Sequence, residues 1–183
     1  DGRDVGGDGH PAQSLSPQNN LSVCFGGAQT DFLDFPMEQR FSLDKWTIEA
    51  WIKPDADEAD GGIIMLRSVA SNAVNYEVGL SVSNTPYVRY VSIGGAEVRA
   101  DSAVPIVADG SNWTHVAASY YDRDLTLYVD GTNVASTTGS AFPALYAGGP
   151  VMQHIGRGFK GCLDEVRLWE EERSAAEIVN GRD

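Results

Sequence analysis

The chain has little positive charge and no long apolar run. It contains 26 acidic residues against 13 basic ones, giving a formal net charge of −13, and only three residues are lysines. Such a surface repels nucleic acid and anionic membranes, and it favours cations, cationic partners or neutral ligands. Adaptation to salty water is an alternative reason for the same charge. No apolar stretch reaches the roughly 18 residues that a membrane span needs, so we expect no membrane insertion.

The usual sequence patterns of catalytic sites are also missing. The chain has no Gly-x-Ser-x-Gly elbow and no phosphate-binding glycine loop. Its three histidines, His10, His115 and His154, follow no zinc-ligand spacing, and we expect His115 to be structural. No predicted strand offers two carboxylates on one face for glycoside hydrolysis. We therefore expect a protein without enzymatic activity.

Cysteine is scarce, with Cys24 and Cys162 as the only two. They allow one disulfide, which would close a loop of about 140 residues and contribute up to roughly 5 kcal/mol to stability. Two separate buried thiols are the alternative.

Helical periodicity is nearly absent, and short alternating strands take its place. The pattern predicts a flexible leader or linker over residues 1–20 and one domain over 21–183. Within the domain, Asp130-Gly131 is a strong hairpin signal, and residues 174–180 are the only helical candidate. We expect an all-β, two-sheet antiparallel sandwich of the jelly-roll type with one short C-terminal helix.

Four segments in order resemble the LamG-like, concanavalin A-like jelly-roll family, together with the ending Arg173-Ser174 and Glu177-Ile178. The segments are Phe41 to Pro54, Trp113 to Ala117, Leu125 to Gly131 and Gly161 to Trp169. The resemblance implies two antiparallel sheets whose first and last strands lie side by side, an arrangement consistent with a Cys24–Cys162 bridge. Family members are usually extracellular modules that bind glycans or proteins, often carry calcium, and sit beside catalytic or adhesive domains.

A calcium site is expected where the end strands meet. Leu163, Val166 and Leu168 cannot share one face by strict alternation, so we expect a bulge near Asp164-Glu165. A carboxylate there needs partners, and a hard cation held by Asp164, Asp31 and carbonyls of the Gly26 to Thr30 turn would supply them. The alternative for Asp164 is a set of backbone N–H donors. Gly26 stands where the family often has an acidic residue.

An aromatic sheet face is the candidate ligand site. Trp51 shares a strand face with Thr47 and Glu49, while Tyr87 and Arg89 share a face on another strand. Aromatic rings beside hydrogen-bonding side chains can hold sugar rings. The alternative for Trp51 is packing under a loop.

Together these features predict a secreted or cell-surface, non-catalytic module that recognises a glycan or an extracellular protein, contains calcium and belongs to a larger multidomain protein. Two alternatives remain open: a pure adhesion or spacer domain, and a glycoside hydrolase or polysaccharide lyase of the same fold.

Overall fold

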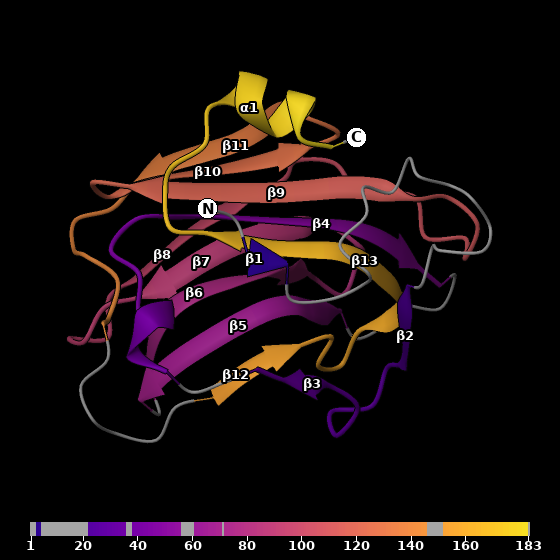
Figure 1. Ribbon diagram of the computed structural model, residues 1–183, viewed down its shortest axis with the longest axis horizontal. Coiled ribbons are helices and arrows are strands. Elements are labelled where there is room, and N and C mark those ends of the chain that lie inside the picture. The colour runs from indigo at the N-terminus through magenta and orange to yellow at the C-terminus, as the bar shows by residue number, and fades with distance from the viewer. Residues whose placement is uncertain are drawn as a thin grey trace.

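The computed structural model describes residues 3–4, 22–35, 38–55, 61–70, 72–145 and 152–182. In these residues the chain forms two antiparallel sheets that pack on each other, with one short α-helix near the C-terminus (Figure 1). The predicted all-β jelly-roll sandwich is confirmed. No described helix is long and apolar enough to cross a membrane.

The first sheet has seven strands. Its order is β1 (Arg3–Asp4), β13 (Lys160–Trp169), β4 (Trp46–Pro54), β9 (Thr114–Tyr121), β10 (Asp124–Val129) and β11 (Thr132–Thr138), and β2 (Val23–Gly26) also pairs with β13.

The second sheet has six strands. Its order is β3 (Leu33–Asp34), β12 (Met152–Ile155), β5 (Gly62–Ala70), β6 (Ala73–Leu80), β7 (Pro86–Val91) and β8 (Glu97–Asp101). A short 3-10 helix, η1 (Gln39–Phe41), precedes β4.

Strand alternation places the core between the two sheets. On β4, Trp46, Ile48, Ala50 and Ile52 belong to the main hydrophobic cluster, so the intervening side chains point to the outer face of the seven-stranded sheet. On β7, Val88 and Tyr90 belong to the same cluster, so Tyr87 and Arg89 lie on the outer face of the six-stranded sheet. Each sheet thus presents a polar face away from the core.

The end strands meet as predicted. Cys24 on β2 lies directly opposite Cys162 on β13, and the two form a disulfide. The predicted bulge is also present, because the pairing of β13 with β4 shifts register between Asp164 and Arg167. Within this bulge Glu165 adopts a positive φ of 50°.

The C-terminal helix, α1 (Ala175–Asn180), begins and ends where its signals predict. Ser174 is the N-cap and accepts a hydrogen bond from the Glu177 amide, while the Glu177 carboxylate accepts one from the Ser174 amide. Gly181 is the C-cap. The helix lies on the outer face of the seven-stranded sheet (Figure 1), where Ile178 packs against Ala117 and Tyr128.

Two described residues of the predicted leader take part in the sheet. Arg3 and Asp4 form β1, which pairs with Leu168 and Arg167 of β13. The rest of the predicted leader lies outside the described residues, as do residues 56–60 between β4 and β5.

Candidate functional site

A polar cluster on the outer face of the six-stranded sheet contains two of the predicted ligand-binding residues. Tyr87 and Arg89 on β7 lie opposite Asp101 and Arg99 on β8, and Arg89 also lies opposite Glu77 on β6. Directly opposed residues share a face and are within contact distance. We call these five residues the tyrosine platform.

The carboxylate of Glu77 organises the buried half of the platform. Arg89 donates to Glu77 through Nε and Nη2 at 2.9 and 2.7 Å, and to Glu97 through Nη1 at 2.7 Å. Hydrogen bonding to Glu77 raises the pKa of Arg89. Tyr87 Oη donates to Glu77 at 2.6 Å, and burial, followed by this carboxylate, raises the pKa of Tyr87. The phenol therefore stays a hydrogen-bond donor at neutral pH.

The other half of the platform is partly exposed, and there Arg99 covers the buried ring of Tyr87. The Arg99 guanidinium lies 3.9 Å from the centroid of the Tyr87 ring, and its Nη2 donates to Asp101 at 2.7 Å. The side chain of Arg99 is 32% exposed and that of Asp101 is 47% exposed. Movement of Arg99 would uncover an aromatic face bordered by donors and acceptors.

Trp51, the third predicted ligand residue, lies on the other sheet and is half-buried under the C-terminal segment (residues 170–182). Its Nε1 donates to the carbonyl oxygen of Arg182 at 3.2 Å. Its ring packs edge-on against the His115 ring, with 5.2 Å between the two ring centroids. Packing under a loop, the alternative raised above, is what the structure has. Trp51 therefore does not share a surface with Tyr87.

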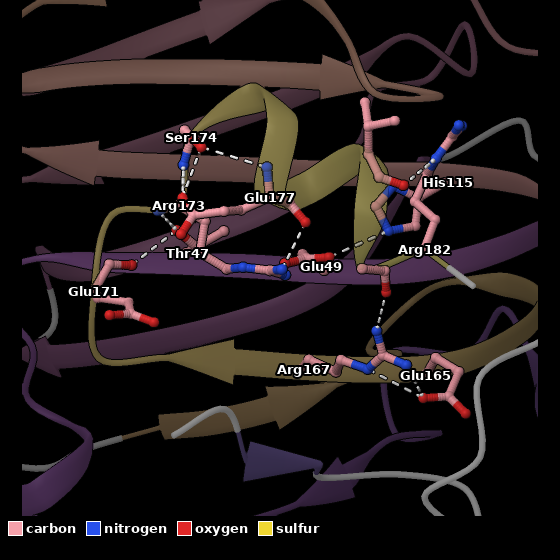
Figure 2. Close-up of polar contacts among 12 residues, drawn as sticks. Thr47, Glu49, His115, Glu165, Arg167, Glu171, Arg173, Ser174, Glu177 and Arg182 are labelled. Carbon is pink, nitrogen blue, oxygen red and sulfur yellow. Dashed lines mark hydrogen bonds and ion pairs between the residues drawn. The ribbon is translucent and has the colours of Figure 1, made fainter.

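The C-terminal segment is held on the seven-stranded sheet by a buried polar network (Figure 2). Arg173 forms an ion pair with Glu49, which is fully buried. Nε2 of His115 lies 3.5 Å from Oε2 of the same carboxylate. Arg167 bonds to Glu165 at 2.7 Å and donates to the carbonyl of Gly181 at 2.6 Å. His115 is thus structural, as predicted.

The residues predicted to hold calcium do not surround one point. Gly26, Thr30 and Asp31 share a turn, in which the Gly26 amide donates to the Asp31 carboxylate. Gly26 lies opposite Lys160 on β13. Asp164 stands four residues beyond Lys160 on the same strand, so it lies about 13 Å from Lys160 along β13. Calcium ligands lie 2.3–2.6 Å from the ion, so Asp31 and Asp164 cannot share one ion in this register.

Asp164 accepts the amide of the next residue, Glu165, at 2.9 Å, which is a backbone donor but belongs to the same strand. Across the described ranges, no three His, Cys, Asp or Glu side chains gather as a metal site. Calcium binding itself stays a prediction.

The sequence did not reveal the contacts of Arg173. Its partners Thr47 and Glu49 stand more than 120 residues earlier in the chain. The only local signal was the polar face of β4, where Thr47 and Glu49 alternate with core residues.

Comparison with solved structures identifies similar domains at 11–17% sequence identity. One is domain 4 of an extracellular arabinanase from Geobacillus stearothermophilus, in complex with arabinotriose, with a TM-score of 0.69 at 17% identity. The match covers 87% of this chain and 75% of the arabinanase domain. A Ruminococcus gnavus sialidase carbohydrate-binding module bound to α2,3-sialyllactose has a TM-score of 0.68 at 14% identity, covering 90% and 96%.

The leech intramolecular trans-sialidase has a TM-score of 0.69 at 13% identity, covering 90% of this chain and 27% of its own. At such identities these likenesses concern the fold. A search of curated proteins finds no match.

The family assignment comes from the sequence. The profile of the laminin G-like family, described as the concanavalin A-like lectin/glucanases superfamily, matches residues 25–179. This match spans both sheets from β2 to α1 and agrees with the observed sandwich. The chain therefore belongs to the concanavalin A-like lectin/glucanases superfamily.

Proposed function

We propose that this domain is a non-catalytic module that binds glycans at the tyrosine platform. The observation that carries the proposal is the Tyr87 ring, which is 8% exposed beneath the Arg99 guanidinium and lies beside Asp101 on the outer face of the six-stranded sheet. A sugar ring presents C–H groups to an aromatic face and hydroxyls to neighbouring polar groups. Similar domains in an arabinanase and a sialidase are known in complexes with oligosaccharides, which supports the same class of ligand here.

The engagement of the buried glutamates supports a binding role over a catalytic one. Glycoside hydrolysis needs two carboxyl groups that flank the same bond. Here Glu49, Glu77 and Glu165 each form an ion pair with a different arginine. Glu77 also lies on the opposite sheet from the other two. These carboxylates hold the structure together and do not face a common substrate.

Neutral glycans fit the charges best. The platform and its neighbour Glu97 bring three carboxylates against the guanidinium groups of Arg89 and Arg99, and the whole chain carries a net charge of −13. Long-range repulsion opposes anionic ligands on such a surface.

We propose further that the module works outside the cell within a larger protein. The Cys24–Cys162 disulfide supports an oxidising compartment. The match to about a quarter of the leech trans-sialidase chain supports a multidomain context.

The ring of Tyr87 should carry the binding. We expect Tyr87→Leu to weaken oligosaccharide binding about tenfold, because stacking on an aromatic ring contributes about 0.5–1.5 kcal/mol beyond buried area. Tyr87→Phe keeps the ring and should bind like the wild type. Titration calorimetry with hits from a glycan array measures both variants, and circular dichroism checks their fold.

Equal affinity in the two variants would contradict the platform as the site. A wild-type protein that binds nothing on the array would instead favour an adhesion or spacer domain.

Calcium is a separate proposal, which we assign to the Gly26–Asp31 turn. The turn offers the Asp31 carboxylate and main-chain carbonyls, both of which calcium prefers. Calcium added to chelator-treated protein should raise the melting temperature, since an ion bound only to the native state stabilises it by about 2.7 kcal/mol at a hundredfold excess over Kd. Asp31→Asn should abolish this shift and Asp164→Asn should not. An unchanged melting temperature in the wild type would contradict calcium binding at this turn.

A further inference from the structure

We propose that the outer face of the β10–β11 hairpin carries a second saccharide site, which takes a neutral saccharide. The site is a groove of about 480 Å³, within the range of about 300–1,000 Å³ typical of small-ligand sites. It lies on the seven-stranded sheet, whereas the tyrosine platform lies on the six-stranded one. We call it the hydroxyl groove and define it by Asp124, Thr126, Ser136, Thr138 and Glu172.

The floor of the hydroxyl groove is an array of hydroxyl groups. Thr126 lies opposite Ser136, and Asp124 lies opposite Thr138. Because Leu125 of the same strand is in the core, these four side chains point outward.

Internal hydrogen bonds orient the groups of the floor. Thr138 Oγ1 donates to Asp124 Oδ1 at 2.6 Å, and Asn133 Nδ2 donates to Ser136 Oγ at 3.0 Å. A hydroxyl has one donor and two acceptor positions, and a carboxylate has about four acceptor positions. The Ser136 hydroxyl donates within the floor, to Asn133 Oδ1 or Thr126 Oγ1, so the Thr126 hydroxyl keeps its donor while the carboxylate and hydroxyl oxygens keep acceptor positions for a ligand rich in hydroxyls.

One wall is Glu172, and the sheet holds it in place from both sides. Thr47 Oγ1 donates to the carbonyl of Glu171 at 2.8 Å and accepts from the Arg173 amide at 2.8 Å. The Arg173 side chain then pairs with buried Glu49, as Figure 2 shows. These bonds fix the backbone on either side of Glu172, and a backbone fixed before binding reduces the entropy lost on association.

Tyr121 lies beside the hydroxyl groove, next to its lining residue Asp124. It pairs with Asp124 across the tight β9–β10 turn and is 53% exposed, unlike its core neighbour Tyr120. An exposed ring beside hydroxyl and carboxylate groups offers the apolar contact that one face of a sugar ring needs.

The chemistry of the lining selects a neutral saccharide. Two carboxylates and several hydroxyls line the groove, without a lysine or arginine among the lining residues. Carboxylates accept from sugar hydroxyls and repel anionic ligands. Asp124 already accepts from Thr138, and the described part of the chain gathers no three acidic or histidine side chains that would favour a metal.

Amide chemical shifts test this site in the full chain. Arabinotriose and lactose, titrated separately, should shift the amides of Thr126, Ser136 and Thr138 with at least one of the two. We expect Thr126→Val and Glu172→Gln each to weaken this interaction up to about tenfold, since the first removes a hydroxyl partner of the sugar and the second removes the charge of an acceptor. Glu38→Gln changes a half-exposed carboxylate outside the groove lining and should leave the affinity unchanged.

The two sites can be separated in the same experiment. Tyr87→Leu should remove shifts at the tyrosine platform and leave those of the hydroxyl groove. Groove amides that do not move with either sugar, or shifts that persist in both groove variants, would overturn the second site. Loss of the groove shifts in Tyr87→Leu would also overturn it, by assigning all binding to the platform. Equal shifts produced by calcium chloride alone would show that the groove binds a cation, and would overturn the saccharide site.

Discussion

Replacing Cys24 and Cys162 together by serine should lower the free energy of unfolding by about 2–5 kcal/mol. The disulfide joins residues separated by 138 positions, so in the unfolded state it restricts most of the chain. In the folded state it ties the four-residue strand β2 to β13, which lies between β2 and β4 in the sheet. Loss of the crosslink therefore favours the unfolded state by freeing its chain, and it loosens the edge strand β2 in the folded state.

Chemical denaturation with and without reductant measures this loss. Reduced wild type should match the serine variant, and the variant should not respond to reductant. Amide exchange should rise first at Val23 and Phe25, because β2 is short and lies at the edge. A serine variant as stable as the oxidised wild type would show that strand pairing alone fixes this edge.

The parts of this fold that the sequence predicted depend on local rules. The Asp164-Glu165 bulge followed from a break in alternation within a few residues, and the structure has it. The cap of α1 followed from Ser174 and Glu177, three residues apart. The hairpin at Asp130-Gly131 followed from residues that tolerate positive φ, which both adopt. Each signal needs only neighbouring residues.

The predicted calcium site failed to converge because it depended on strand register. Knowing that the end strands are neighbours does not say which residues are opposite each other, and an error of four residues moves a side chain by about 13 Å. The observed pairing of Gly26 with Lys160 separates Asp31 from Asp164. Register comes from contacts between distant segments, which a single sequence does not display.

The candidate ligand residues show the same limit. Alternation correctly placed Tyr87 and Arg89 on one face, and the structure adds the bond of both to Glu77. Alternation also put Trp51 on an outward face, and packing under a loop was the alternative for it, but the pattern did not identify residues 170–182 as the covering segment. The sequence therefore predicted which face of a strand is polar, but not which distant segment covers it.

The buried ion pair between Glu49 and Arg173 should have the second large effect. We expect Glu49→Gln to destabilise the protein by about 3–5 kcal/mol, because Arg173 would keep its charge in a largely buried site without its partner. The double variant Glu49→Gln with Arg173→Met removes both charges and should recover a large part of that loss. Urea denaturation of the single variants and the double variant gives the coupling between the two residues.

The exposed pair of Glu38 and Arg40 provides the control. Both of these side chains are about half exposed, so Glu38→Gln should change stability by less than about 1 kcal/mol. A Glu49→Gln variant that behaves like this control would mean that solvent reaches the network and that the C-terminal segment is loosely held.

The same variant connects the stability of the fold to the hydroxyl groove. Arg173 is the residue next to Glu172 and is paired with Glu49, so loss of Glu49 should free the groove wall even where the two sheets stay folded. We expect faster amide exchange at Arg173, whose N–H bonds to Thr47, and weaker binding of neutral sugars in the groove, with the tyrosine platform unaffected. Unchanged exchange at Arg173 would mean that Thr47 and the packing of Ile178 hold the segment without the ion pair.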